Sequence, residues 1–249
     1  MIAFGEVVVI GGGCYGSFYL GQLVKARAAG AATWDRLLVV DRDPACRAAA
    51  ALEAVPAAEL RVAEWAPFLE GWLDPAVRSP DDRIVPSPLM PHLMASWVEA
   101  RARDRWPDRE VGMVPAEAEL GTPFDRLHPG DGVRYVSYAD WLCPVHCIEP
   151  ARCPAIRAPR QWEMSEAVTA WTSARRREHP TAGPALFACR HATYGVGMYP
   201  ATLAFEALAS LEAEVAAHPE GADLVVGSVS ACHGAVGVLR VGPEPTTKA

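Results

Sequence analysis

The sequence predicts an α/β protein with a doubly wound, mostly parallel sheet, interrupted by an irregular insertion rich in cysteine and proline. Runs of β-branched residues without polar alternation, such as Val7–Ile10, are typical of strands buried on both faces of a parallel sheet. Helical segments alternate with these runs, which is the pattern of right-handed crossover connections. The alternation stops over residues 111–162 and resumes after them, so the insertion separates two α/β halves.

The N-terminal half, residues 1–110, is expected to alternate strands and helices. Its first helix follows a glycine-rich turn and ends at Gly30, because glycine readily adopts the left-handed conformation that terminates helices. The other helices are expected over Ala45–Ala54 and after Pro86-Ser87-Pro88, the latter ending near Trp106-Pro107. The strands are expected at Val7–Ile10, Leu37–Val40, Leu60–Ala63 and Arg83–Val85.

Residues 111–162 show little hydrophobic periodicity, and a long irregular stretch inside a compact domain usually has a function. The C-terminal half, residues 163–249, is expected to pack on the same sheet as the N-terminal half. Its helices are expected at Ser165–Arg177 and Ala201–Ala217, and its strands at Ala185–Cys189, Leu224–Val229 and Val236–Val241.

Composition narrows the class of protein. Hydrophobic residues make up 51% and charged residues 21% of the 249 residues, as in ordinary globular proteins. The formal net charge of -7, with no long block of Lys and Arg, argues against nucleic-acid binding. No apolar segment reaches the length of about 18 residues that a membrane span needs, and the N-terminus lacks the basic region of a secretory signal. We therefore expect a cytoplasmic protein without a nucleic-acid or membrane partner.

The turn Gly11-x-Gly13-x-x-Gly16 stands between an expected strand and an expected helix. Gly11 allows a tight turn, Gly13 allows a pyrophosphate to approach closely, and Gly16 allows the helix to pack closely on the strand. The free N–H groups at the start of the helix then bind phosphate. Asp41 closes the second strand, where a carboxylate accepts hydrogen bonds from ribose hydroxyls.

This arrangement resembles the NAD(P)-binding Rossmann superfamily over residues 6–43. The resemblance implies a Rossmann-like fold and NAD as the ligand, since the Asp41 carboxylate would repel the 2′-phosphate of NADP. Arg42 offsets part of that repulsion, which leaves NADP as an alternative. A further alternative is a unit of this fold that does not bind nucleotide.

The loop CPVHCIEPARCP carries Cys143, Cys147 and Cys153. In a reducing cytoplasm, clustered thiols favour a metal or redox site over disulfides. The prolines stiffen the loop and reduce the entropy lost when several thiolates bind one centre. Soft thiolates select zinc or an iron–sulfur cluster, although the spacing matches neither a zinc ribbon nor a ferredoxin. The alternative is that these cysteines are small buried hydrophobic residues.

Cys189 and Cys232 are the candidates for a fourth ligand, because each follows an expected apolar strand. Ligands bind at the carboxyl ends of strands in parallel sheets. His191 and His233 lie near these cysteines in the sequence and are candidates for a general acid or base beside a nicotinamide. The alternative for each histidine is a satisfied polar group without a catalytic role.

Together these motifs predict an NAD(H)-binding, oxidoreductase-type protein with a cysteine-bound centre, either iron–sulfur or zinc. An iron–sulfur centre would exchange electrons with the cofactor, whereas zinc would hold the loop or polarise a carbonyl substrate. The alternative is a non-enzymatic regulatory or accessory subunit that senses nucleotide or redox state. The expected partners are a dinucleotide and a protein of a redox complex.

Overall fold

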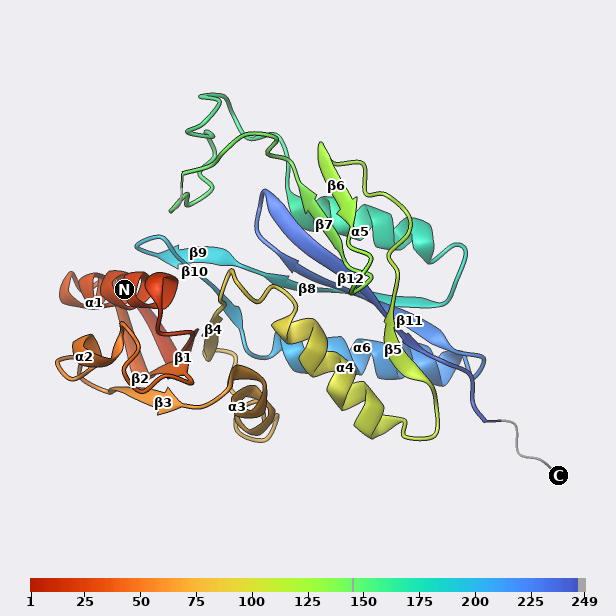
Figure 1. Cartoon of the computed structure of the whole chain (residues 1–249), viewed down its shortest axis with the longest axis horizontal. Coiled ribbons are helices and arrows are strands. Elements are labelled where there is room, and N and C mark those ends of the chain that lie inside the picture. Colours follow the sequence, from red (N-terminus) through yellow and green to blue (C-terminus); the bar gives the residue numbers. More distant parts are fainter. Residues whose placement is uncertain (145, 246–249) are drawn as a thin grey trace. The chain divides into compact units, whose positions relative to one another are not determined.

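The computed structural model describes residues 1–144 and 146–245. Within this part of the chain the protein is mixed α/β, with two six-stranded sheets that each contain parallel and antiparallel pairs (Figure 1). The chain divides into two compact units. The first unit comprises Met1–Leu93 and Cys189–Thr202, and the second takes the rest of the described chain.

The sheet of the first unit has the strand order β3-β2-β1-β4-β10-β9. β1 is parallel to β2 and β4, and β2 is parallel to β3. β10 is antiparallel to both β4 and β9. The strands are β1 (Ile2–Ile10), β2 (Ala32–Asp41), β3 (Ala58–Val62), β4 (Arg83–Val85), β9 (Arg190–Thr193) and β10 (Val196–Pro200).

The central strand β1 is covered on both faces. Val7 packs in one cluster with Leu20 and Leu23 of helix α1, while the next residue, Val8, is also fully buried. Burial on both faces explains why β1 has an unbroken apolar run instead of polar alternation. The helices of this unit are α1 (Cys14–Ala28), α2 (Ala49–Leu52) and α3 (Trp65–Trp72).

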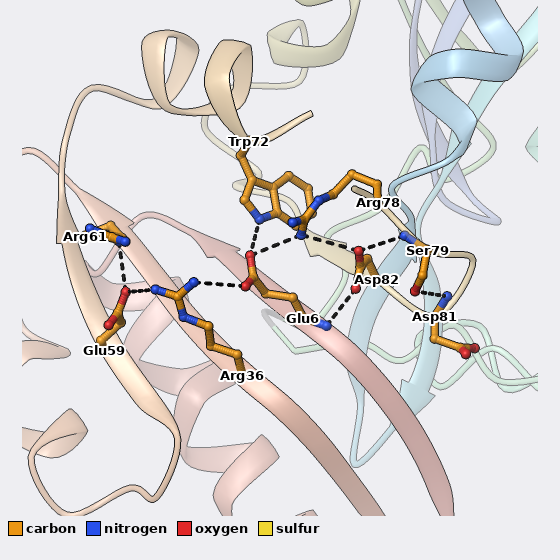
Figure 2. A network of polar contacts seen from close by, with 9 residues as sticks. All are labelled: Glu6, Arg36, Glu59, Arg61, Trp72, Arg78, Ser79, Asp81 and Asp82. Carbon is orange, nitrogen blue, oxygen red and sulfur yellow. Dashed lines mark hydrogen bonds and ion pairs between the residues drawn. The ribbon is translucent and has the colours of Figure 1, made fainter. Parts of the chain in front are cut away.

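A network of charged side chains joins the strands of the first sheet to the turn that precedes β4 (Figure 2). The Glu6 carboxylate pairs with Arg36 and Arg78, each at 3.2 Å, and accepts a hydrogen bond from the Trp72 indole. Asp82 accepts a hydrogen bond from the Glu6 N–H at 2.7 Å and pairs with Arg78 at 3.3 Å. Because Glu6 and Arg78 are only 13% and 11% exposed, this pairing offsets the cost of burying their charges.

The sheet of the second unit has the order β6-β7-β12-β11-β8, and β5 also pairs with β12. β11 is antiparallel to β12 and parallel to β8. The strands are β5 (Val111–Val114), β6 (Phe124–Leu127), β7 (Arg134–Ser137), β8 (Thr181–Ala188), β11 (Ala222–Val229) and β12 (His233–Val241). The remaining helices are α4 (Leu93–Arg105), α5 (Met164–Arg175) and α6 (Leu203–Ala217).

Helix α5 covers part of the second sheet through a hydrophobic cluster. Met164 and Val168 pack there with Val225 of β11 and Val236 of β12. Helix α6 packs on β8 and β11. Leu224, which alternates with Val225 along β11, is also fully buried.

Asp223 is a fully buried charge in β11. Arg240 donates two hydrogen bonds to its carboxylate, at 2.8 and 2.9 Å, and Arg175 of α5 donates another. Burial by itself would raise the pKa of Asp223, but the hydrogen bonds from Arg240 and Arg175 lower it below the ordinary value. These ion pairs connect α5 to β11 and β12.

The structure corrects the expectation of one mostly parallel sheet. β11 and β12 belong to a second sheet, and both sheets mix parallel and antiparallel pairs. Residues 111–162, expected to be irregular, contain β5, β6 and β7. These strands are only four residues long, so they carry no recognisable pattern, and β5 and β7 form by pairing with the distant β12.

Helix α3 and the β9–β10 hairpin were not expected either. The hairpin adds to the first sheet through pairing of β10 with β4, a contact between residues far apart in the sequence. In the residues that the structure describes, no helix combines the length and the apolar character needed to cross a membrane.

Candidate functional site

The glycine-rich turn connects β1 to α1 at the carboxyl end of β1. Gly11 has a φ of +88°, in the left-handed region that favours glycine. A Cβ atom on Gly16 would lie 1.7 Å from the carbonyl oxygen of Gly11, so only glycine fits at this position. A Cβ atom on Gly13 would meet no described atom within 4 Å, so this position faces open space.

A cavity of about 530 Å³ lies at this turn and is within the usual size range of ligand pockets. Helix α1 begins there with Gly13 as its N-cap, without a side-chain cap and without an acidic residue in its first turn. Its first N–H groups are therefore available to an anion. The lining residues include Gly11, Gly13, Tyr15, Gly16, Asp41, Arg42, Glu64, Trp65 and Ser87.

Asp41 lines this cavity, but its carboxylate already has partners. Its Oδ2 accepts a hydrogen bond from the Gly12 N–H at 2.7 Å, and its Oδ1 accepts one from the Asp43 N–H at 2.9 Å. Each carboxylate oxygen can accept a second hydrogen bond, so a ribose hydroxyl remains an eligible donor. The structure adds a role that the sequence reasoning missed, because Asp41 also holds the glycine-rich turn against the end of β2.

The loop cysteines lie at a different cavity, of about 250 Å³, in the second unit. Cys143, Cys147 and Cys153 line it together with Cys232, which comes from the turn between β11 and β12. The fold therefore places a distant fourth thiol at the cavity that the three loop cysteines line. The other lining residues are Ala139, Trp141, Pro144, Glu149, Pro150, Pro154, Arg160 and His233.

Cys189, the other candidate for a fourth ligand, follows β8 but lies in the first unit. Its sulfur lies 2.4 Å from the position that a Cβ on Gly197 would occupy. Cys189 is not one of the described residues that line the cysteine cavity. Within residues 1–144 and 146–245, no group of three or more Cys, His, Asp or Glu side chains already has a geometry that could hold a metal ion.

Glu149 connects the cysteine loop to the β11–β12 turn. Its carboxylate accepts hydrogen bonds from the Ser230 hydroxyl at 2.6 Å, the Ala231 N–H at 2.8 Å and the Cys232 N–H at 3.2 Å. Its own N–H donates to the Cys147 sulfur at 3.4 Å. The φ of Glu149 is +50°, which is uncommon for a residue with a side chain. One residue thus fixes Cys232 relative to the loop thiols.

Two tryptophans lie beside the thiols. The Trp162 indole N–H donates to the Cys232 sulfur at 3.2 Å, and the Trp162 ring stacks on Tyr138 with centroids 5.8 Å apart. Burial raises the pKa of the Cys232 thiol to about 11, although the Trp162 hydrogen bond opposes this increase. Burial, Cys147 and Cys153 also raise the pKa of Cys143, while Trp141 lowers it in part. A cation that binds these sulfurs must therefore displace protons.

The candidate histidines lie in different units. His233 lines the cysteine cavity, and its Nδ1 lies 2.9 Å from the Ser137 hydroxyl oxygen. His191 lies in β9 of the first unit, opposite Gly197 of β10. A catalytic role for either histidine remains a prediction.

Sequence reasoning did not single out Glu149, Trp141, Trp162 or Arg160. The sequence could have pointed to Glu149, because it lies between Cys147 and Cys153 and a carboxylate among thiols needs hydrogen-bond donors of its own. Trp141 and Trp162 flank the cysteine loop in the sequence, but only the fold shows that Trp162 reaches Cys232.

Comparison with known proteins gives a family match that covers much of the second unit. No curated protein and no solved structure matches the chain. The family model AF_1314_C, described as "Uncharacterized protein, C-terminal domain", matches residues 94–242. The matched range includes all four cysteines that line the cavity, and it spans more than half of the chain. The chain therefore belongs to the AF_1314_C family.

Proposed function

We propose that this protein is a nucleotide-binding redox protein, which binds NAD(H) in its first unit and a thiolate-bound metal centre in its second. The observation that carries the proposal is that Cys232 lines the same cavity as Cys143, Cys147 and Cys153. Four thiols on one cavity form a complete ligand set for zinc or for an iron–sulfur cluster. Cys232 is therefore the proposed fourth ligand, in preference to Cys189.

Preorganisation of the thiols supports this ligand set. The loop is stiffened by prolines that line the cavity, and Glu149 ties it to the backbone of Cys232. In known metal sites, residues that hydrogen-bond to the ligands and orient them raise metal affinity by about 10–100-fold. A bound cation would also offset the mutual repulsion of neighbouring thiolates.

The first unit supports a dinucleotide as the second ligand. Its strand order begins β3-β2-β1-β4, all parallel, which is how the strand order of a Rossmann dinucleotide-binding fold begins. The cavity at the uncapped start of α1 suits a pyrophosphate, and Gly13 leaves room for it. Arg42 lies 3.9 Å from Glu64, so its charge is partly compensated, which favours NAD over NADP.

Metal analysis tests the ligand set. Protein purified without oxygen is assayed for zinc and iron in the wild type, in Cys232→Ser and in the control Cys189→Ser. We expect about one centre per chain in the wild type and in Cys189→Ser, and loss of most of the metal in Cys232→Ser. A wild-type protein with neither zinc nor iron would refute the proposed centre.

Calorimetry with oxidised and reduced NAD and NADP tests the nucleotide site. Gly13→Ala is compared with Gly21→Ala, because the added Cβ meets no described atom within 4 Å at either position but only Gly13 lines the cavity. We expect Gly13→Ala to weaken NAD binding and Gly21→Ala to leave it unchanged. The nucleotide proposal fails if none of the four forms binds the wild type.

Addition of NADH separates an oxidoreductase from a sensor. In an oxidoreductase the metal centre or a substrate is reduced as NADH is consumed, whereas a regulatory subunit binds NADH without consuming it. We propose the oxidoreductase class, because a dinucleotide site and a thiolate centre in one chain suit electron transfer.

A further inference from the structure

Two residues that line the cysteine cavity, Trp141 and Arg160, each carry a buried hydrogen-bond donor without an acceptor among the described residues. The Nε1 atom of Trp141 and the Nε atom of Arg160 are buried and have no hydrogen-bond partner among the residues that the structure describes. Both residues line the cavity. The Trp141 N–H interacts with the Cys143 thiol, although not in the geometry of a full hydrogen bond. Since a buried donor without an acceptor is costly, the cavity is suited to a ligand that supplies acceptors.

Two sulfurs of the cavity already accept N–H hydrogen bonds. Trp162 donates to Cys232 at 3.2 Å, and the Glu149 backbone donates to Cys147 at 3.4 Å. Such bonds stabilise negative charge on sulfur, and in iron–sulfur proteins they help to set the reduction potential. Sulfur atoms of the cavity thus accept N–H hydrogen bonds, and two residues that line it, Trp141 and Arg160, have a buried N–H group without a described acceptor.

The cavity has room for a cluster as well as for one ion. Four thiolates around zinc lie about 2.3 Å from the metal, so the ion and its ligands leave no space between them. The observed cavity of about 250 Å³ is larger than one ion. An iron–sulfur cluster places several iron and sulfide ions between the thiolates, and its sulfides accept hydrogen bonds. Zinc brings no such acceptor.

We infer that Cys143, Cys147, Cys153 and Cys232 bind an iron–sulfur cluster, and that Trp141 and Arg160 donate hydrogen bonds to its sulfur atoms. The inference rests on the proposed function, which assigns these four thiols to one metal centre without choosing the metal. The cationic side chain of Arg160 would also offset the negative charge of a cluster with four thiolate ligands.

Composition of the bound centre tests the inference. Protein purified without oxygen is assayed for iron, acid-labile sulfide and zinc, and metal-free protein is reconstituted with ferrous iron and sulfide. We expect iron and sulfide in equal amounts and a broad visible absorption that dithionite bleaches. Bound zinc together with failure of reconstitution would overturn the cluster but leave the four-thiol centre in place. Failure to bind any metal would overturn both proposals.

The reduction potential tests the role of Trp141. Trp141→Phe keeps an aromatic ring but removes the N–H, and Trp97→Phe is a matched control because its Nε1 is also buried without a described partner, outside the cavity. We expect a lower midpoint potential in Trp141→Phe and the wild-type value in Trp97→Phe, as measured by redox titration. If Trp141→Phe does not fold, Trp162→Phe, which removes the bond to Cys232, should shift the potential in the same direction. An unchanged potential in a variant that retains its cluster would refute the assigned hydrogen bonds.

Discussion

The two cavities of this protein are built in different ways. The glycine-rich turn at the first cavity is formed by a strand, a turn and a helix that follow one another in the sequence, although residues at the ends of β2, β3 and β4 or just after them also line that cavity. The cysteine cavity combines a loop outside regular secondary structure with a turn between two strands much later in the chain. A site made by consecutive elements leaves its pattern in the sequence, whereas a site made by distant segments depends on the fold.

The means of support differ as well. In the glycine-rich turn, steric fit and backbone hydrogen bonds to Asp41 hold the geometry. In the cysteine cavity, the carboxylate of Glu149 connects the two segments. The geometry of the glycine-rich turn should therefore be most sensitive to a single added methyl group. The geometry of the cysteine cavity should be most sensitive to loss of the Glu149 carboxylate.

The largest expected effect is that of Gly16→Ala. The added methyl group would lie 1.7 Å from a backbone oxygen, which no side-chain movement can relieve, so α1 must shift from β1. We expect a loss of about 3–5 kcal/mol in the free energy of unfolding, measured with urea. Gly21→Ala, also in α1, should not destabilise the protein, and equal stabilities of the two variants would contradict steric support.

Asp223 tests whether the sheet of the second unit depends on a buried ion pair. The pKa of Asp223 is lowered in the folded state, so its stabilising effect is present above the unfolded pKa of about 3.9 and is lost as pH falls through the lower folded pKa. Asp223→Asn should cost about 3 kcal/mol at neutral pH, because Arg175 and Arg240 lose their anionic partner. Unfolding curves between neutral and acid pH should converge for the two proteins, and parallel curves would contradict this role.

Glu149→Ala tests the connection between the two segments of the cysteine cavity. Loss of the acceptor for Ser230, Ala231 and Cys232 should free the fourth thiol, and we expect metal affinity to fall by about 10–100-fold. Competition with a chelator measures this change. Glu119→Ala, which alters an exposed glutamate, serves as the control. Wild-type affinity in Glu149→Ala would show that the loop is held by other contacts.

Asp41→Asn should have the smallest effect. The amide can accept only one of the two hydrogen bonds that the carboxylate accepts from Gly12 and Asp43, so we expect a loss of about 1 kcal/mol in stability. The ratio of NAD to NADP affinity should also narrow, because the repulsion of a 2′-phosphate is removed. Asp35→Asn, at an exposed position of β2, is the control. An unchanged ratio would exclude Asp41 from contact with the ribose.

The elements that could be predicted from the sequence have an internal pattern. β1, α1, β2, α5, α6 and β11 carry apolar runs or stripes that are long enough to indicate their structure without knowledge of their partners. β7 could not be predicted in this way, since its Arg134 is only 4% exposed. That burial is stabilised by an ion pair with Asp125 at 2.6 Å and a hydrogen bond to the Ala116 carbonyl at 2.8 Å, and both partners lie outside β7.

For the candidate sites, the sequence by itself determined the glycine spacing and the proximity of Cys143, Cys147 and Cys153, because few residues separate them. It did not distinguish Cys189 from Cys232, since both follow apolar strands and have the same local pattern. Only the tertiary structure shows that Cys232 lines the cavity of the loop cysteines, whereas Cys189 is not among the described residues that line it. After β11 the chain turns back at once into β12, and Glu149 holds that turn at the loop, whereas after β8 the chain continues into the first unit. The path of the chain after a strand depends on which distant strand the next segment pairs with, and no local pattern of residues encodes that pairing.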